Sequence, residues 1–261
     1  MREDIKHADI IVVKVGTSLL VSPETGVLEP AISKLAEVLS ELMATGKKLI
    51  LVSSGAVGAG LTQLGAVSKF TAAAVGQGIL TSLYEAAFRE HEQAIGQLLV
   101  SREILAVAES RQAFTETIHE LLAHGILPII NENDAVTIDG EEWKNKFEDN
   151  DELSLLVAEA VQADLLVMLT DVNGLYSENP LVNEQATMIS HLSEIDQRLL
   201  EESDPHLGEL SRGGIKSKLK TATGALTANI SMVLANGKSP YVLFDILAGQ
   251  EVGTLFKKIS T

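Results

Sequence analysis

The 261-residue sequence contains no cysteine. This absence excludes disulfide bonds, thiolate nucleophiles and cysteine-ligated metal sites. Aromatic residues make up only 4% of the chain, so we expect a core of Val, Ile, Leu and Ala. No apolar run reaches the roughly 20 residues that a membrane-spanning helix needs. The N-terminal stretch MREDIKHADI lacks the apolar segment of a signal peptide. These absences together predict a cytoplasmic globular protein.

Positive charge is also scarce. The chain has 20 Lys and Arg against 36 Asp and Glu, which gives a formal net charge of −16 at pH 7. Such an acidic surface repels nucleic acids and anionic lipids, so we expect neither nucleic acid nor a membrane as a main partner. An anionic substrate would need a site that gathers its own local cations. The six histidines show no ligand spacing, and no protein metal site or Ser-His-Asp set is predicted.

Short apolar runs alternate with helical patterns along the chain. The strand candidates are IIVVKVG, KKLILVSSG, AIGQLLVS, GILPIINEND, DLLVMLT and ISMVLANG. They are apolar throughout rather than at every second residue, which predicts an α/β fold whose mainly parallel sheet is covered by helices on both faces. We expect one domain in two lobes, residues 1–162 and 163–261. The polar stretch 178–208 is predicted to be an irregular, mobile insertion.

In such sheets, ligands bind beyond the carboxyl ends of the strands, and unusual residues stand there. Lys14 closes an otherwise apolar strand and is followed by Gly16, Thr17 and Ser18. A phosphate-facing turn would explain this pattern, because glycine lets an oxyanion approach the backbone and lysine supplies a charge. The alternative is a lysine that extends from a strand end to solvent.

Two glycine-rich stretches come after the second strand. SSGAVGAG, residues 53–60, is a strand-to-helix turn, and the amides at a helix N-terminus favour anions. Small residues there would equally let the helix pack closely on the sheet. The stretch matches neither the dinucleotide fingerprint nor a P-loop. AAAVGQG, residues 72–78, lies inside a helical pattern, and tight helix packing explains it better than a site does.

Acidic and amide side chains cluster in NENDA, residues 131–135, and EDNDELS, residues 148–154. Carboxylates can bind an ammonium group, and amide N–H groups can bind a carboxylate. For the second cluster a simpler explanation stays open, because Asn150 or Asp151 could merely cap the helix that follows.

Two further stretches could bind a nucleotide. Thr170 and Asp171 end a strand within LTDVNGLYSENP, where they could hold the ribose and base or form a plain surface turn. SRGGIKSKLK, residues 211–220, concentrates positive charge in an acidic chain, which favours a phosphate site over a solvated basic face.

Together these stretches resemble the amino acid kinase family, and within it the glutamate 5-kinases. The resemblance runs in order through VVKVGTSLL, VSSGAVGAG, AAAVGQ, PIINENDAV, DNDELS, LLVMLTDVNGLY, GGIKSKL and VGTLF. NENDA followed by DND separates it from uridylate kinase, aspartokinase and carbamate kinase. The family implies a three-layer αβα sandwich, with an N-terminal lobe that binds the amino acid and a C-terminal lobe that binds ATP.

The resemblance implies ATP-dependent phosphorylation of the side-chain carboxylate of L-glutamate, the first step of proline biosynthesis. Lys14 and Lys218 match the two lysines that contact the transferring phosphoryl group, and Asp151 matches the acid that holds both. Asp134 is expected to bind the α-ammonium group, while Ser54 and Asn150 help to fix the carboxylates.

The implied nucleotide site gathers residues from both halves of the chain, and Mg²⁺ should arrive with ATP. Its members are Lys14, Gly16, Gly55, Thr170, Asp171, Arg212, Gly213, Gly214, Ile215, Lys216, Ser217 and Lys218. Among these, Gly16 and Gly55 match glycines whose amides face the phosphoryl group. The chain departs from the family pattern at Arg212, which replaces a threonine, and at Ile215, which replaces a methionine.

The resemblance also implies a homodimer or homotetramer, and feedback inhibition by L-proline at a site that overlaps the glutamate site. Many members carry a C-terminal PUA domain, and since this sequence stops just after VGTLFKKIST we expect none. Two other functions stay open: a kinase for another small carboxylate or carbamate, and a nucleotide or amino acid sensor without turnover.

Overall fold

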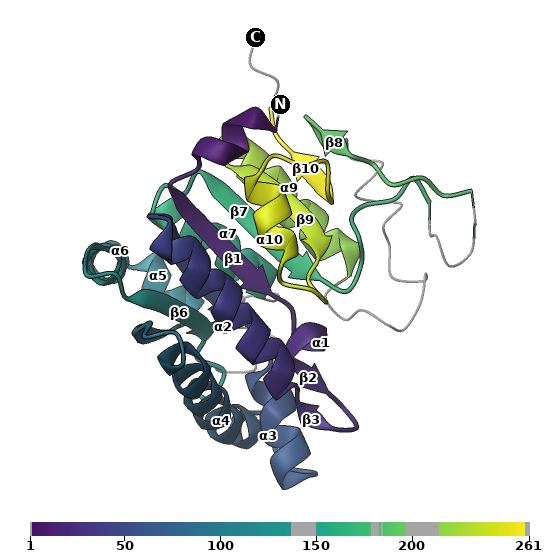
Figure 1. Cartoon of the computed structure of the whole chain (residues 1–261). Helices are drawn as coiled ribbons and strands as arrows, with labels where there is room; N and C mark the ends of the chain where they lie inside the picture. Colours follow the sequence, from purple (N-terminus) through teal and green to yellow (C-terminus); the bar gives the residue numbers. More distant parts are fainter. Residues whose placement is uncertain (1, 137–149, 179–182, 184, 197–213, 259–261) are drawn as a thin grey trace.

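The computed structural model describes residues 2–136, 150–178, 183, 185–196 and 214–258. Figure 1 shows these residues as one αβα sandwich. The strands of its main sheet are β1 (Ile10–Val15), β4 (Lys48–Ser53), β5 (Ile95–Val100), β6 (Leu127–Glu132), β7 (Leu165–Thr170), β8 (His191–Leu192), β9 (Ser231–Asn236) and β10 (Thr254–Phe256). A separate short hairpin joins β2 (Val21–Ser22) to β3 (Gly26–Val27).

Helices connect the strands and cover the sheet. They are the 3-10 helix η1 (Glu3–His7) and the α-helices α1 (Thr17–Leu20), α2 (Glu29–Ala44), α3 (Ala56–Leu64), α4 (Lys69–Arg89), α5 (Arg102–Ala106), α6 (Ala108–Ala123), α7 (Asn150–Ala160), α9 (Ile215–Thr227) and α10 (Val242–Leu247). Within the described ranges, none of these helices is long and apolar enough to cross a bilayer.

The strand order is β5-β6-β4-β1-β7-β9-β10-β8. All neighbouring pairs are parallel except β9 and β10, which run antiparallel. The chain moves from β1 to β4 on one side and later adds β7 on the other side, so a topological switch point lies beside β1. Such points are where ligands bind in open α/β sheets. The predicted α/β class and mainly parallel sheet are confirmed.

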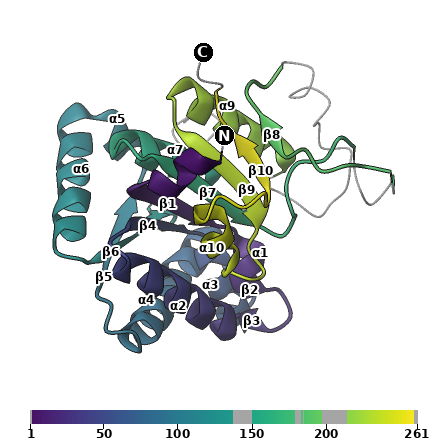
Figure 2. The same ribbon diagram turned by 45° about the horizontal axis from the view of Figure 1, so that its top comes forward.

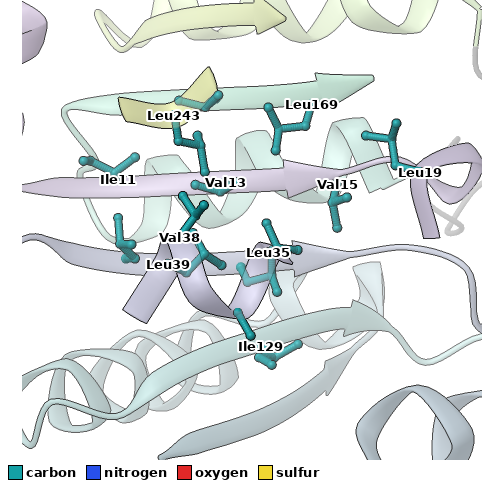
Figure 3. Close-up of a cluster of buried hydrophobic side chains, with 14 of the residues drawn as sticks. Ile11, Val13, Val15, Leu19, Leu35, Val38, Leu39, Ile129, Leu169 and Leu243 are labelled. Carbon is teal, nitrogen blue, oxygen red and sulfur yellow. The ribbon is translucent and has the colours of Figure 1, made fainter. Parts of the chain in front are cut away.

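Two buried clusters hold the layers together, one on each face of the sheet. Figures 1 and 2 show the helices that cover these faces. Helices α2, α4 and α10 cover one face, where Figure 3 shows β1 packed against α2 through side chains such as Val13 and Leu39. Helices α6, α7 and α9 cover the opposite face, where Val12 packs with Val157 and Leu219. Both clusters are dominated by aliphatic residues, as the low aromatic content predicts.

Alternation along β1 decides where Lys14 points. Successive side chains of a strand face opposite sides, and Val13 and Val15 belong to the cluster beneath α2. Val12 belongs to the cluster beneath α7 and α9. Lys14 shares the parity of Val12, so it faces α7 and α9 and is itself buried.

The structure differs from the predicted elements at several short segments. The stretch 178–208 is not wholly irregular, since its described part contains β8, which pairs in parallel with β10; the rest lies partly outside the described residues. Strand β10 has three residues and α10 six, too few for a clear period in the sequence. These short elements depend on tertiary packing rather than on local pattern.

Helices α3 and α4 pack with their backbones in close contact, and two glycines permit it. A Cβ at Gly60 would lie 1.9 Å from the carbonyl oxygen of Ala72, and one at Gly76 would lie 1.8 Å from that of Ala56. The tight packing predicted for AAAVGQG is therefore present at Gly76. The close contact also keeps α3 at the carboxyl end of β4, next to the residues described below.

We expect Gly76→Ala to lower the free energy of unfolding by about 1–3 kcal/mol, because the added methyl group must push two backbones apart. Urea unfolding followed by circular dichroism measures this change. Gly78→Ala on the same helix is the matched control, since a Cβ there meets nothing within 4 Å and alanine favours a helix over glycine by about 0.5–1 kcal/mol. Equal effects of the two substitutions would contradict the packing role of Gly76.

Candidate active site

A single buried carboxylate bridges two lysines from distant parts of the chain. Lys14 Nζ lies 2.6 Å from Oδ1 of Asp151, and Lys218 Nζ lies 3.2 Å from Oδ2. The side chain of Asp151 is 1% exposed, against 8% for Lys14 and 13% for Lys218. The two cations predicted to act together are thus held by one acid, and both ammonium groups keep some access to solvent.

The three residues meet because three elements converge at the switch point. Lys14 is the penultimate residue of β1, Asp151 lies in the first turn of α7 and Lys218 in the first turn of α9. Asp151 therefore sits at the N-terminal end of α7, where the helix dipole favours a negative charge. Helix α7 begins at Asn150, so neither Asn150 nor Asp151 is its N-cap residue, and the carboxylate of Asp151 contacts the two lysines instead.

The charge balance keeps Asp151 ionised. Burial by itself raises the pKa of this carboxyl, but the charges of Lys14 and Lys218 and their hydrogen bonds outweigh the burial. The net result is a pKa below the usual value of an aspartic acid. A buried carboxylate that stays charged can hold two ammonium groups in place at neutral pH.

A second polar cluster lies at the ends of β4 and β6. Asn150 Nδ2 donates to the carbonyl oxygen of Ser53 at 2.8 Å, to Ser54 Oγ at 2.9 Å and to Asn131 Oδ1 at 2.8 Å. Asn131 Nδ2 in turn donates to Gln77 Oε1 at 2.8 Å. The predicted pair Ser54 and Asn150 is brought together, one residue along the chain from Asp151.

The two predicted glycines differ in their surroundings. Gly55 has a left-handed backbone with φ 102° and precedes α3, and a Cβ there would lie 3.1 Å from Val21.

The amide of Gly16 donates to the carbonyl oxygen of Leu169 at 3.1 Å. The expectation that the Gly16 amide faces a phosphoryl group therefore does not fit this structure, because the amide extends the pairing of β1 with β7. A Cβ at Gly16 would lie 3.8 Å from Lys14 Nζ, so glycine here keeps the ammonium group accessible.

The nucleotide-binding candidates lie on the β7 side of the switch point. Thr170 ends β7 and donates to Asp171 Oδ1 at 3.1 Å. Gly214 precedes α9, where Ile215, Lys216, Ser217 and Lys218 form the first turn; the side chain of Lys216 is exposed. Arg212 and Gly213 lie outside the described residues.

A cavity of about 590 Å³ opens beside the Asn131 cluster. Its polar lining residues include Gln77, Thr81, Glu85, Gln97, Glu132 and Asp134. Asp134, predicted to bind an ammonium group, lines this cavity, whereas Ser54 and Asn150 are not among the lining residues. The volume lies in the range of small-molecule sites.

Sequence reasoning did not single out Asn131 or Gln77 as site residues. Asn131 is buried at the end of β6, and in the sequence its motif NENDA shows only a cluster of acidic and amide residues. The stretch that contains Gln77 favours helix packing, because a glutamine on a helix gives no local signal of its partner. The signal that could have found Gln77 is a polar side chain on the helix face that packs against the sheet.

Comparison with known proteins gives consistent matches. The model described as "Amino acid kinase family" matches residues 9–236. The glutamate 5-kinase of Enterococcus faecalis is 43% identical over 265 aligned residues, which cover 99% of this chain and 98% of the relative. The glutamate 5-kinase of Lactiplantibacillus plantarum is 41% identical over 253 aligned residues, which cover 94% of this chain and 96% of the relative.

Two solved structures share the fold. Isopentenyl phosphate kinase from T. acidophilum superposes with a TM-score of 0.64 at 16% identity, covering 95% of this chain and 100% of that one. UMP kinase from Bacillus anthracis also superposes with a TM-score of 0.64, at 15% identity and with 97% of both chains covered. The expected three-layer sandwich with a mainly parallel sheet is confirmed by these likenesses.

Proposed function

Because this chain belongs to the amino acid kinase family, we propose that it transfers the γ-phosphoryl group of ATP to the side-chain carboxylate of L-glutamate. The product is L-glutamyl 5-phosphate, the first intermediate on the way to proline. The structural observation that carries the proposal is the buried carboxylate of Asp151 between Lys14 and Lys218. The predicted resemblance to glutamate 5-kinases agrees with the names of the relatives.

The chemistry needs cations more than a base. A carboxylate is already ionised at pH 7, so the attacking oxygen needs no proton removed. The obstacle is repulsion between two anions as the carboxylate approaches the γ-phosphorus in line. Lys14 and Lys218 offset this repulsion and stabilise the charge on the transferring phosphoryl group. Asp151 fixes both ammonium groups but leaves them a net charge of +1 for the reaction.

Binding of ATP is proposed at the ends of β7 and α9. Thr170 and Asp171 would contact the nucleoside part, and Gly214 to Lys218 the phosphates, with Gly55 facing the phosphoryl group from the opposite side. Mg²⁺ would supply charge neutralisation on the phosphates. Among the described residues no cluster of three or more acidic or histidine side chains is placed to hold a metal ion. The ion would arrive with ATP and be held mainly by phosphate oxygens and water, as is usual for Mg²⁺.

Asp134 is proposed to bind the α-ammonium group of glutamate, since this acidic residue lines the cavity. We expect Asp134→Ala to raise the KM for glutamate by about 100-fold, as loss of a charge-assisted contact predicts. The KM for ATP should change little. Initial rates over a glutamate series measure both constants. An unchanged glutamate KM would remove Asp134 from the substrate site.

The test of the proposed function is a panel of acceptors with detection of ADP. Glutamate, N-acetylglutamate, aspartate and carbamate are offered to the purified chain with ATP and Mg²⁺. Fastest turnover with glutamate supports the proposal, and a free ammonium group should be required because Asp134 disfavours an acetylated one. Turnover with another acceptor would indicate a kinase for a different small acid. Binding of ATP and glutamate without ADP release would indicate a sensor.

Four further properties are proposed because the chain belongs to this family. The protein would act in the cytoplasm, assemble as a homodimer or homotetramer and be inhibited by L-proline at a site that overlaps the glutamate site. A glutamate-binding lobe, residues 1–162, and an ATP-binding lobe, residues 163–261, are likewise proposed, and the strand order supports this division. Strands β5, β6, β4 and β1 form one half of it, and β7, β9, β10 and β8 the other.

A further inference from the structure

The amide groups near the proposed glutamate site form a hydrogen-bond chain with a defined direction. Side-chain amides can be turned either way without a change in shape, but backbone groups cannot. The amide N–H of Glu132 donates to Asn131 Oδ1 at 2.9 Å. This backbone donor identifies the atom that faces it as oxygen, so Asn131 Nδ2 must be the atom that faces Gln77.

The other end of the chain is fixed in the same way. The carbonyl oxygen of Ser53 can only accept, so the Asn150 atom 2.8 Å away is Nδ2. The same atom donates to Asn131 Oδ1 and Ser54 Oγ. Its two N–H groups are thus shared among three protein oxygens. Within the described part of the chain, no hydrogen bond involves Asn150 Oδ1.

Gln77 is held in the matching orientation by its own helix. Thr81 Oγ1 donates its single proton to the carbonyl oxygen of Gln77 at 2.7 Å. It accepts from Gln97 Nε2 at 2.7 Å and, more weakly, from Gln77 Nε2 at 3.4 Å. The amide nitrogen of Gln77 therefore faces Thr81, and Oε1 faces Asn131.

We propose that Gln77 is a positioning residue: through Asn131, and together with the backbone groups of Glu132 and Ser53, it holds Asn150 and Ser54 in the direction in which they meet the substrate. With this direction, Asn150 offers a carbonyl oxygen and Ser54, which accepts from Asn150, offers its hydroxyl proton. One acceptor and one donor fit the ammonium and carboxylate groups of an amino acid. Asn150 then binds the ammonium group together with Asp134, rather than a carboxylate as the family resemblance suggests. The inference rests on the proposed function.

The test compares two acceptors that differ only in the ammonium group, L-glutamate and glutarate. We expect Gln77→Met, which keeps the length but removes the acceptor, to raise the glutamate KM about tenfold, as expected for one net hydrogen bond to a buried group. The kcat should stay within about threefold, and the preference for glutamate over glutarate in kcat/KM should fall about tenfold. A merely structural role would lower kcat/KM for both acceptors alike and leave their ratio unchanged.

Three further variants make the outcome specific. Gln77→Glu retains an acceptor for Asn131 and should keep most of the preference for glutamate. Gln112→Met is the matched control, because Gln112 is exposed on α6 and donates a hydrogen bond to Glu116, away from the proposed site. In the Asn131→Ala background, Gln77→Met should add little further rise in KM. Additive effects of these two substitutions, or an unchanged acceptor ratio in Gln77→Met, would overturn the inference.

Failure of the inference is distinct from failure of the proposed function. If the unaltered chain does not phosphorylate glutamate, the proposed function fails before any variant is compared. If it does, and Gln77→Met retains its glutamate preference with an unchanged melting temperature, only the role of Gln77 is refuted.

Discussion

Lys218→Ala is expected to reduce kcat at least about 1,000-fold while leaving the affinity for glutamate within about twofold. Removal of one preorganised positive group from a transferring phosphoryl group commonly has an effect of this size, about 10³-fold in rate. Glutamate affinity should survive, because the substrate candidates Ser54, Asp134 and Asn150 lie at the ends of β4, β6 and the start of α7. Lys218 comes from α9, on the nucleotide side.

Two measurements separate these effects. Steady-state rates at saturating ATP give kcat, and isothermal titration with L-glutamate in the absence of nucleotide gives the affinity. Lys220→Ala is the matched control, since this exposed lysine lies on the same helix two residues further on and should retain full turnover. Comparable kcat values for the two variants would refute the role assigned to Lys218.

The sheet and its main helices were predictable because their signals are local. Strands such as β7 and β9 are continuous apolar runs of six residues, and α2 carries an apolar stripe that spans four turns. The three-residue β10 and two-residue β8 offered no comparable signal. Their pairing depends on the neighbouring strand, which a local pattern does not contain.

The candidate site was predictable in its members but not in its geometry. Lys14 stood out because a charge interrupts an apolar strand, yet its partner Asp151 also had a simpler explanation as a helix cap. In the folded chain the carboxylate of Asp151 contacts both Lys14 and Lys218, which the local sequence does not show. The amide direction at Asn150 depends on the carbonyl oxygen of Ser53 and on Asn131, which lie on other elements, so no spacing rule could have predicted it. The same holds for the Gly16 amide, which is occupied by Leu169 of the adjacent strand.

Asp151→Asn is the second substitution with a large expected effect, and it should act on both activity and stability. The variant retains the shape of the side chain but removes the charge that holds Lys14 and Lys218. Breaking a buried ion pair on one side leaves uncompensated charge and typically costs about 3–5 kcal/mol. We expect the free energy of unfolding at pH 7 to fall by about 3 kcal/mol. This value is the lower end of that range, because both lysines retain partial access to solvent. The kcat should fall about 100-fold, because the two ammonium groups are no longer fixed.

The matched control removes an acid from an exposed ion pair. Asp9 contacts Lys48 at 2.8 Å, and both side chains are about half exposed. Surface pairs contribute roughly 0–1 kcal/mol, so Asp9→Asn should change the free energy of unfolding by less than about 1 kcal/mol and leave kcat unchanged. Urea unfolding and initial rates on the three proteins measure the difference. A loss of stability in Asp151→Asn no greater than in Asp9→Asn would contradict the bridging role.

The pH dependence distinguishes lost charge from a local packing defect. The lysines hold the pKa of Asp151 in the folded protein below its ordinary value, which is about 3.9 in an unfolded chain. Its contribution to stability is therefore fully present above about pH 3.9 and is lost as the pH falls through the lower, folded pKa. In that window the unaltered protein should lose about 1.4 kcal/mol per pH unit relative to Asp151→Asn. A packing defect would instead keep the two stability curves parallel, so urea titrations between pH 7 and pH 3 decide whether the carboxylate acts through its charge.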